Sequence, residues 1–169
     1  MENKNKQILL ELLRDMEDFA RLKGIECPVI YLIGGAGCII AGYLERATVD
    51  FDFIDINYPA KAGRLFKILD RFDMLDLYVT PVAPEFEKRA IKIEGFDSVY
   101  VLSREDIIVS KLGRYSEKDR EDIKKLMTGA DKEKLKKLIE LVINRKDFSP
   151  VVKYRFIKNV KDFEEEYNV

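Results

Sequence analysis

The feature that most constrains the fold is an apolar run, Val29–Ile33, that ends directly in two glycines. The run has the length and composition of a buried strand, and the glycines allow a tight turn after it. The segment Ala36–Leu44 is short and mostly apolar, so we predict a helix there. Such a strand-to-helix junction exposes backbone N–H groups which, with the positive end of the helix dipole, can bind an anion. Gly34 and Gly35 therefore form a candidate phosphate site.

Two aspartates follow on a second apolar run, Val49–Ile56. Because side chains alternate along a strand, Asp50 and Asp52 share one face of it. Taken alone, this pair favours the solvated face of an edge strand. Carboxylates so placed can also converge on one or two divalent cations that neutralise a triphosphate. Beside a phosphate-binding turn, the pair predicts metal-dependent phosphoryl or nucleotidyl transfer.

The composition limits the chemistry that the chain can perform. No histidine is present, which removes the commonest general base and the usual zinc ligand. A metal would be held by oxygen atoms, which favours Mg²⁺ or Mn²⁺. The net charge is −1, so binding of nucleic acid would need a local basic patch. No apolar run is long enough to span a membrane and no signal-peptide core is present, so we expect a cytoplasmic protein.

The periodicity of apolar residues predicts an α+β fold, in which helices flank a mixed β-sheet. Further strands are expected over residues 74–79, 90–94 and 98–102. Helices are expected over residues 5–23, 57–72, 103–115, 116–127, 131–145 and 149–167.

A third carboxylate, Asp76, lies on the strand predicted at Met74–Val79. If that strand is a neighbour of the one with the aspartate pair, Asp76 becomes a third metal ligand. The alternative is that Asp76 caps a turn or pairs with Lys67 or Arg71.

These motifs resemble the nucleotidyltransferase superfamily of polymerase-β type. That superfamily uses a Gly-Gly or Gly-Ser turn that opens a helix, an Asp-x-Asp strand and a third acid on a neighbouring strand. The form Arg46-x-Thr48-x-Asp50-x-Asp52 more closely resembles its bacterial and archaeal branch of toxin-like and uncharacterised stand-alone members. Two later segments, Arg104–Leu112 and Lys118–Ile123, are similar to the helical motifs of that branch. The resemblance covers roughly Ile30 to Met127.

The resemblance implies a role for each residue of the turn and of the strands. Gly34 and Gly35 would line the triphosphate, and Gly35 stands where other branches have a serine. Asp50 and Asp52 would hold the metal. Asp76 would be a further ligand or the base for the acceptor hydroxyl.

Four other residues receive roles from the same resemblance, and each has a plainer alternative. Arg46 and Thr48 would brace the start of the Asp-x-Asp strand or touch phosphate. Lys111 would meet the phosphates as a point charge, or extend its stem over apolar neighbours to reach water. Asp119 would lie near the acceptor or the nucleotide, or serve as a first-turn acid that the helix dipole favours.

The function that the resemblance implies is Mg²⁺- or Mn²⁺-dependent transfer of a nucleoside monophosphate from a triphosphate such as ATP to a hydroxyl acceptor. A tRNA or a protein is the expected acceptor, in a toxin–antitoxin setting. The alternative is a non-catalytic nucleotide-binding or antitoxin-like partner module of the same fold.

The domain organisation follows from the same comparison. Residues 1–128 would form the nucleotidyltransferase-like domain, and residues 129–169 a helical extension packed on it. The extension is locally basic, and Tyr154 and Phe156 lie among its Lys and Arg residues, as on an RNA-contacting surface. The same pattern also fits the outer face of amphipathic helices.

Overall fold

The computed structural model describes residues 2–169, which form two compact units. The first unit contains the chain up to Leu75 together with Ala90–Leu102. The second contains Asp76–Arg89 and Ser103–Val169. The boundary expected after residue 128 does not coincide with this division and stays a prediction.

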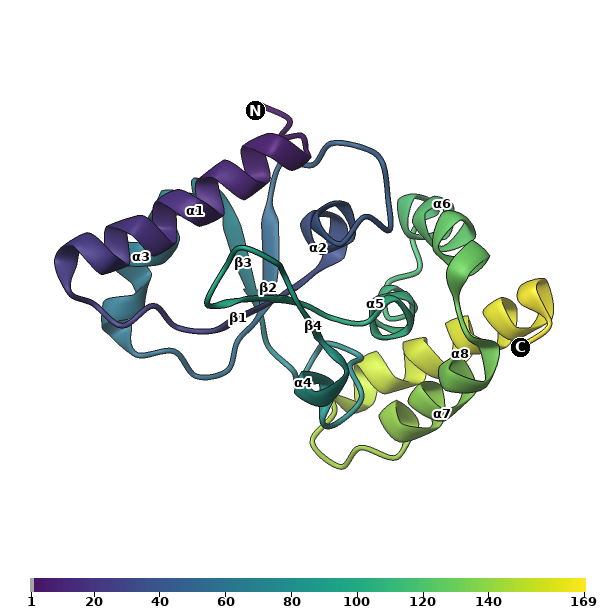
Figure 1. Ribbon diagram of the computed structural model, residues 1–169. Coiled ribbons are helices and arrows are strands. Elements are labelled where there is room, and N and C mark those ends of the chain that lie inside the picture. Colours follow the sequence, from purple (N-terminus) through teal and green to yellow (C-terminus); the bar gives the residue numbers. More distant parts are fainter. Residues whose placement is uncertain (1) are drawn as a thin grey trace. The chain divides into compact units, whose positions relative to one another are not determined.

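A five-stranded mixed sheet lies at the centre of the first unit (Figure 1). The strand order is β3-β2-β1-β5-β4, with β1–β2 and β4–β5 antiparallel and β2–β3 and β1–β5 parallel. The predicted fold class, a mixed sheet flanked by helices, is confirmed. The strands are β1 (Ile30–Ile33), β2 (Phe51–Ile54), β3 (Phe72–Leu75), β4 (Ile91–Lys92) and β5 (Val99–Val101).

Three helices of the first unit pack on one face of this sheet. The pairing register places Leu32, Phe53 and Val101 on the same face. Phe66 contacts Phe53 there, with ring centroids 4.9 Å apart, and Gly37 lies against Val101. The helices are α1 (Lys6–Lys23), α2 (Gly34–Ile40) and α3 (Gly63–Phe66), and α3 is flanked by 3-10 turns at Ala60–Ala62 and Lys67–Leu69.

The first helix has the ends that its sequence predicts. The side chain of Asn5 accepts the N–H of Ile8 at 3.0 Å, which satisfies one of the unpaired donors at a helix start. Gly24 ends the helix in the left-handed conformation, with φ +64°. Leu9 and Leu13 are fully buried, so the predicted apolar face of α1 is its core face.

The third strand differs from its predicted bounds. The helix predicted to reach Phe72 ends at Leu69, and Asp70 adopts φ +70°. β3 then occupies Phe72–Leu75, and residues 76–79, predicted as strand, lie outside it. The reason is packing, because the parallel register with β2 stacks Phe72 on Phe53, with ring centroids 5.8 Å apart.

The second unit is helical. Helix α5 contacts α6 and α7, and α7 contacts α8. Ser103, Ser116 and Ser149 cap helix starts, as their sequence positions predict. The helices are α4 (Phe86–Arg89), α5 (Arg104–Lys111), α6 (Glu117–Leu126), α7 (Lys132–Ile143) and α8 (Pro150–Tyr167), with a 3-10 turn at Met127–Gly129.

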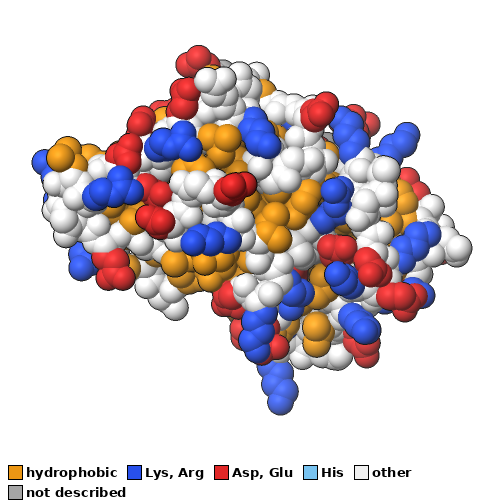
Figure 2. Space-filling view, in the orientation of Figure 1, with side chains coloured by type: hydrophobic (Ala, Val, Ile, Leu, Met, Phe, Trp, Pro, Cys, Tyr) orange, Lys and Arg blue, Asp and Glu red, His pale blue; other side chains and the backbone are white. Residues whose placement is uncertain are grey.

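The surface carries both signs of charge. Lys and Arg side chains are interspersed with Asp and Glu over the face shown in Figure 2, in agreement with a net charge of −1. Among residues 2–169, no helix combines the length and the apolar character needed to cross a bilayer.

Candidate functional site

The glycine turn after β1 lies directly against Asp52. The antiparallel register of β1 and β2 places Asp52 opposite Ile33, the residue before the turn. Gly34 has φ +66°, and a Cβ atom built on it would lie 2.5 Å from Oδ2 of Asp52. Only glycine fits this position, because both the backbone conformation and the carboxylate exclude a side chain.

The second glycine of the turn lies against Arg46 and Thr48. A Cβ atom on Gly35 would lie 2.8 Å from Nη2 of Arg46 and 3.1 Å from Oγ1 of Thr48. The guanidinium therefore fills the space that a side chain at position 35 would need. The helix behind the turn, α2, has only seven residues. The positive charge at this turn therefore comes chiefly from Arg46.

The close approach at Gly34 predicts an unequal pair of alanine variants. Gly34 and Gly24 have φ +66° and +64°, so an alanine at either carries the cost of a left-handed residue, about 1–2 kcal/mol. At Gly24 a Cβ would meet no other described residue within 4 Å, whereas at Gly34 it would displace Asp52. We expect Gly34→Ala to lower the free energy of unfolding in urea more than Gly24→Ala. Equal losses would contradict the contact.

Charged side chains occupy neighbouring positions on β2 and β3. Asp50 immediately precedes β2, and its Oδ1 accepts Nε of Arg71 at 2.8 Å. The next neighbours in the parallel register are Asp52 and Asp73. Cross-strand neighbours point to the same face, and Phe53 takes the helix-covered face, so Asp52 and Asp73 lie on the opposite face.

Asp73 was not predicted from the sequence, although a signal for it exists. Phe72-Asp73-Met74-Leu75 repeats the alternation of Phe51-Asp52-Phe53-Ile54, the strand with which it pairs. The predicted third acid, Asp76, instead lies in the turn after β3 and belongs to the second unit. Its Oδ1 accepts the N–H of Tyr78 at 2.8 Å.

The structure does not group the three predicted carboxylates, Asp50, Asp52 and Asp76, around one point. Within residues 2–169, no three or more acidic, cysteine or histidine side chains are grouped so that they could hold a metal ion. The role of Asp76 as a ligand or a base therefore stays a prediction.

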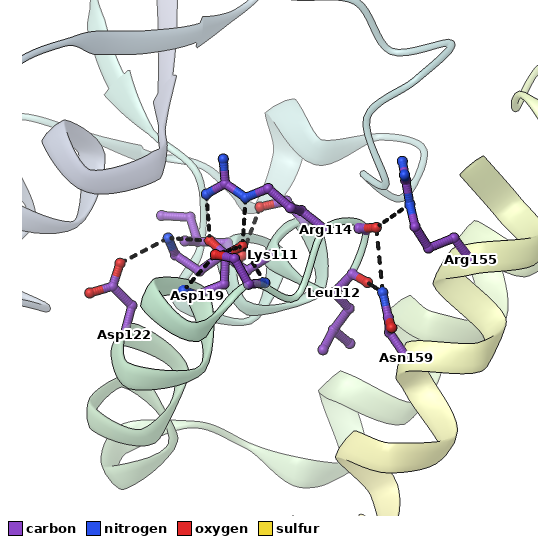
Figure 3. Close-up of polar contacts among 11 residues, drawn as sticks. Lys111, Leu112, Arg114, Asp119, Asp122, Arg155 and Asn159 are labelled. Atoms are coloured by element: carbon purple, nitrogen blue, oxygen red, sulfur yellow. Dashed lines mark hydrogen bonds and ion pairs between the residues drawn. The ribbon is translucent and has the colours of Figure 1, made fainter. Parts of the chain in front are cut away.

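A second cluster of predicted residues lies in the second unit, around the end of α5 (Figure 3). The Nζ atom of Lys111 lies 3.1 Å from Oδ2 of Asp122 and 3.8 Å from Oδ1 of Asp119. The side chain of Lys111 is 9% exposed, and those of the two aspartates are 4% exposed. Lys111 is therefore a buried ammonium held by carboxylates. Contact with phosphate would require an exchange of partners.

Asp119 is held by several donors. Arg114 binds both carboxylate oxygens, with Nε at 2.8 Å and Nη2 at 2.9 Å. Ser116 donates its N–H and its hydroxyl to Asp119, and its hydroxyl oxygen accepts the N–H of Asp119, which completes a capping box at the start of α6. Burial alone would raise the pKa of Asp119, but the hydrogen bonds from Arg114 and Ser116 and the Lys111 charge outweigh it. The pKa lies below its ordinary value, so this carboxylate stays ionised.

Helix α8 fixes the backbone between α5 and α6 (Figure 3). Nδ2 of Asn159 donates to the carbonyl of Leu112 at 2.8 Å, and Nε of Arg155 donates to that of Gly113 at 3.1 Å. These carbonyls belong to the end of α5, where helical partners are missing. The sequence motif thus forms a rigid polar network in the second unit, and its contact with a nucleotide stays a prediction.

Comparison with known protein families gives one match over most of the chain. A family model described as a nucleotidyltransferase of unknown function (DUF6036) matches residues 7–168. The chain belongs to this nucleotidyltransferase family. No curated protein and no solved structure matches the chain. The suspected superfamily is confirmed, and membership implies a nucleotide substrate.

The carboxylates of the first unit fit a divalent cation that shares its ligands with a nucleotide. Mg²⁺ in such sites is typically held by one or two carboxylates together with substrate phosphates and water. Asp50 and Asp52 supply two carboxylates on one face, and Oδ2 of Asp52 lies at the turn where a Cβ on Gly34 would stand. All of these donors are oxygen atoms, the ligands that Mg²⁺ and Mn²⁺ prefer.

Proposed function

We propose that the chain transfers a nucleoside monophosphate from a nucleoside triphosphate to a hydroxyl group, with Mg²⁺ or Mn²⁺ bound by Asp50 and Asp52. One observation carries the proposal, namely that the turn at Gly34, Asp52 and Arg46 meet in the first unit. A turn without side chains lets a polyphosphate approach the backbone. The Arg46 guanidinium offers a fork of donors that matches phosphate oxygens.

The reaction is a substitution at phosphorus. The acceptor oxygen forms a bond to the α-phosphorus, the bond from that phosphorus to the bridging oxygen breaks, and pyrophosphate leaves. Asp50 and Asp52 would hold the divalent cation, which would neutralise charge on the phosphates. Arg46 and Thr48 bind phosphate oxygens at the turn and keep the triphosphate in line. The acceptor proton passes to a carboxylate, for which Asp73 and Asp76 are the candidates.

The register of β2 and β3 predicts that substitution of Asp73 slows transfer more than substitution of Asp76 does. Asp73 is the cross-strand neighbour of Asp52, whereas Asp76 caps its own turn. We expect Asp73→Asn to slow transfer roughly 100-fold, the lower end for a lost proton acceptor. Asp76→Asn should change the rate little, because an Asn oxygen can still accept the Tyr78 N–H. If Asp76→Asn slows transfer more than Asp73→Asn does, Asp76 is the proton acceptor instead.

The proposed acceptor is a hydroxyl of an RNA, with tRNA as the first to test and protein as the alternative. Tyr154 on α8 is 76% exposed, and the exposed Lys158 and Lys161 follow it on the same helix. An exposed aromatic ring beside lysines is typical of surfaces that stack a base and bind the backbone phosphates. Phe156 is fully buried in the core, so it does not belong to this surface.

The direct test is incubation of the purified protein with α-labelled triphosphates, Mg²⁺ and separate RNA, protein and metabolite fractions. Transfer predicts label in one fraction and release of pyrophosphate. A second candidate, a non-catalytic nucleotide-binding module, is favoured by the internal pairing of Lys111 and Asp119. Calorimetry separates the two functions, because Mg²⁺-dependent binding of a triphosphate without label in any fraction supports the module.

The toxin–antitoxin setting is tested in cells. Induced expression of an active toxin should arrest growth, and expression of an inactive variant with the same fold should not. If the protein is instead the antitoxin-like partner, its expression leaves growth unchanged and relieves arrest by a cognate toxin.

A further inference from the structure

Arg71 lies next to the proposed metal-binding carboxylates but belongs to none of the predicted motifs. It immediately precedes β3, and the N–H of Phe51 donates to its carbonyl at 3.0 Å. Its Nε donates to Oδ1 of Asp50 at 2.8 Å. The Arg71 guanidinium thus binds Asp50, one of the two carboxylates that the proposed function assigns to the metal.

The surroundings of Arg71 are acidic. Besides Asp50, the charges of Asp70 and Asp73 also raise the pKa of Arg71. A second nearby cation, Lys4, is engaged by the carbonyl of Val49 at 2.7 Å and by Asp70 at 3.3 Å. Arg71 is therefore the cation that the structure pairs with Asp50.

We propose that Arg71 is an exchangeable counter-ion of Asp50, which it leaves for the phosphates of a nucleotide when a metal takes the carboxylate. This inference rests on the proposed function. The Arg71–Asp50 pair is exposed, with 49% and 38% of the two side chains accessible to water. Exposed pairs contribute little to stability and exchange readily, so a divalent cation can displace the guanidinium.

The order of the strands places Arg71 within reach of the turn. In the sheet, β2 lies between β1 and β3. The turn at Gly34 follows β1 and Arg71 precedes β3, so Asp50 lies between them. Two strand spacings of about 4.8 Å each separate β3 from β1. The Arg71 guanidinium already covers the first of them, because it binds Asp50, so phosphates that extend from the turn towards Asp50 come within its reach. Its planar fork suits phosphate oxygens as well as it suits a carboxylate.

The exchange couples metal binding to nucleotide binding. A metal alone must displace Arg71 from Asp50 and supplies no new anion to replace the hydrogen bond that is lost. A metal bound with a triphosphate supplies that anion, so each ligand strengthens the binding of the other. The coupling is reciprocal, and a measurement of either affinity reveals it.

The test measures Mn²⁺ binding by the loss of the free-ion EPR signal, with and without a non-hydrolysable triphosphate analogue. We expect Arg71→Ala to bind Mn²⁺ alone about two- to fivefold more tightly, because the exposed pair no longer competes. The same variant should lose roughly fivefold or more of the enhancement that the analogue gives the wild type. Arg71→Lys keeps the charge but loses the planar fork of donors. Its Mn²⁺ affinity and its enhancement by the analogue should lie between those of the wild type and of Arg71→Ala.

The control is Arg64→Ala, an exposed arginine on α3 of the same unit, which should leave both affinities at the wild-type values. Wild-type affinities in Arg71→Ala overturn the inference, as does a wild type that binds no Mn²⁺. A failure of the proposed function looks different. Mn²⁺ and the analogue would then show the coupling and its loss in Arg71→Ala, yet no acceptor fraction would be labelled.

Discussion

Replacing Asp52 by Asn should reduce nucleotidyl transfer by roughly 10²–10³-fold or more, the scale of a single preorganised electrostatic contact. Asp52 is the carboxylate that the structure places directly at the glycine turn. Asparagine has nearly the same shape, so it keeps the packing at Gly34 but removes the negative charge that a metal needs. We expect triphosphate binding to lose its dependence on Mg²⁺ as well. Both quantities are measured on the same preparation, by labelling and by calorimetry.

The matched control is Asp55→Asn, just beyond the end of β2. The carboxylate of Asp55 accepts the N–H of Asn57 at 2.9 Å, a contact that an Asn oxygen can keep. Transfer by this variant should stay at the wild-type rate. If Asp52→Asn retains wild-type transfer with an unchanged melting temperature, the first unit is not the catalytic centre.

Local sequence patterns predicted the elements that local interactions determine. The periodicity of α1 and the helix starts at Ser103 and Ser116 are read from a few neighbouring residues, and all are confirmed. The strand at Ile30–Ile33 was also found, because it is short, apolar and followed by glycine.

Long-range pairing determines what the sequence did not predict. The bounds of β3 depend on its parallel register with β2, and the positive φ of Asp70, which ends the preceding turn, carries no strong local signal. The shift of β3 places Asp73 beside Asp52 and leaves Asp76 outside the strand. The predicted strand begins two residues late and ends four residues late, so Asp76, expected on the strand, lies in the turn after it.

The candidate site was predictable as a set of motifs but not as a set of contacts. The sequence predicted that the glycine turn and the Arg46–Asp52 segment act together, and the structure brings Gly35 against Arg46. It did not predict that Lys111 is buried between aspartates or that Arg71 pairs with Asp50. Such pairings join residues that are distant in sequence, and charge alone does not select one partner among many.

Replacing Arg89 by Ala should destabilise the second unit by about 3 kcal/mol, the lower end for breaking a buried ion pair, since Arg89 is 28% exposed. Its Nε and Nη2 bind the two oxygens of Asp106 at 2.8 and 2.9 Å, and Asp106 is 1% exposed. Arg89 also donates to the carbonyls of Ala83 and Pro84. The variant leaves a carboxylate in the interior without its cation. The melting temperature should fall by roughly 6–12 °C.

Three further variants separate the buried charge from the loss of contacts in general. Lys88→Ala removes the neighbouring cation, whose pair with Glu85 is exposed, and should change the melting temperature little. Arg89→Lys keeps the charge without the bidentate contact, so its melting temperature should lie between those of the wild type and of Arg89→Ala. Arg89→Met combined with Asp106→Leu should recover much of the stability, because no carboxylate is then left uncompensated. If this double variant loses at least as much stability as Arg89→Ala, the uncompensated charge is not the cause.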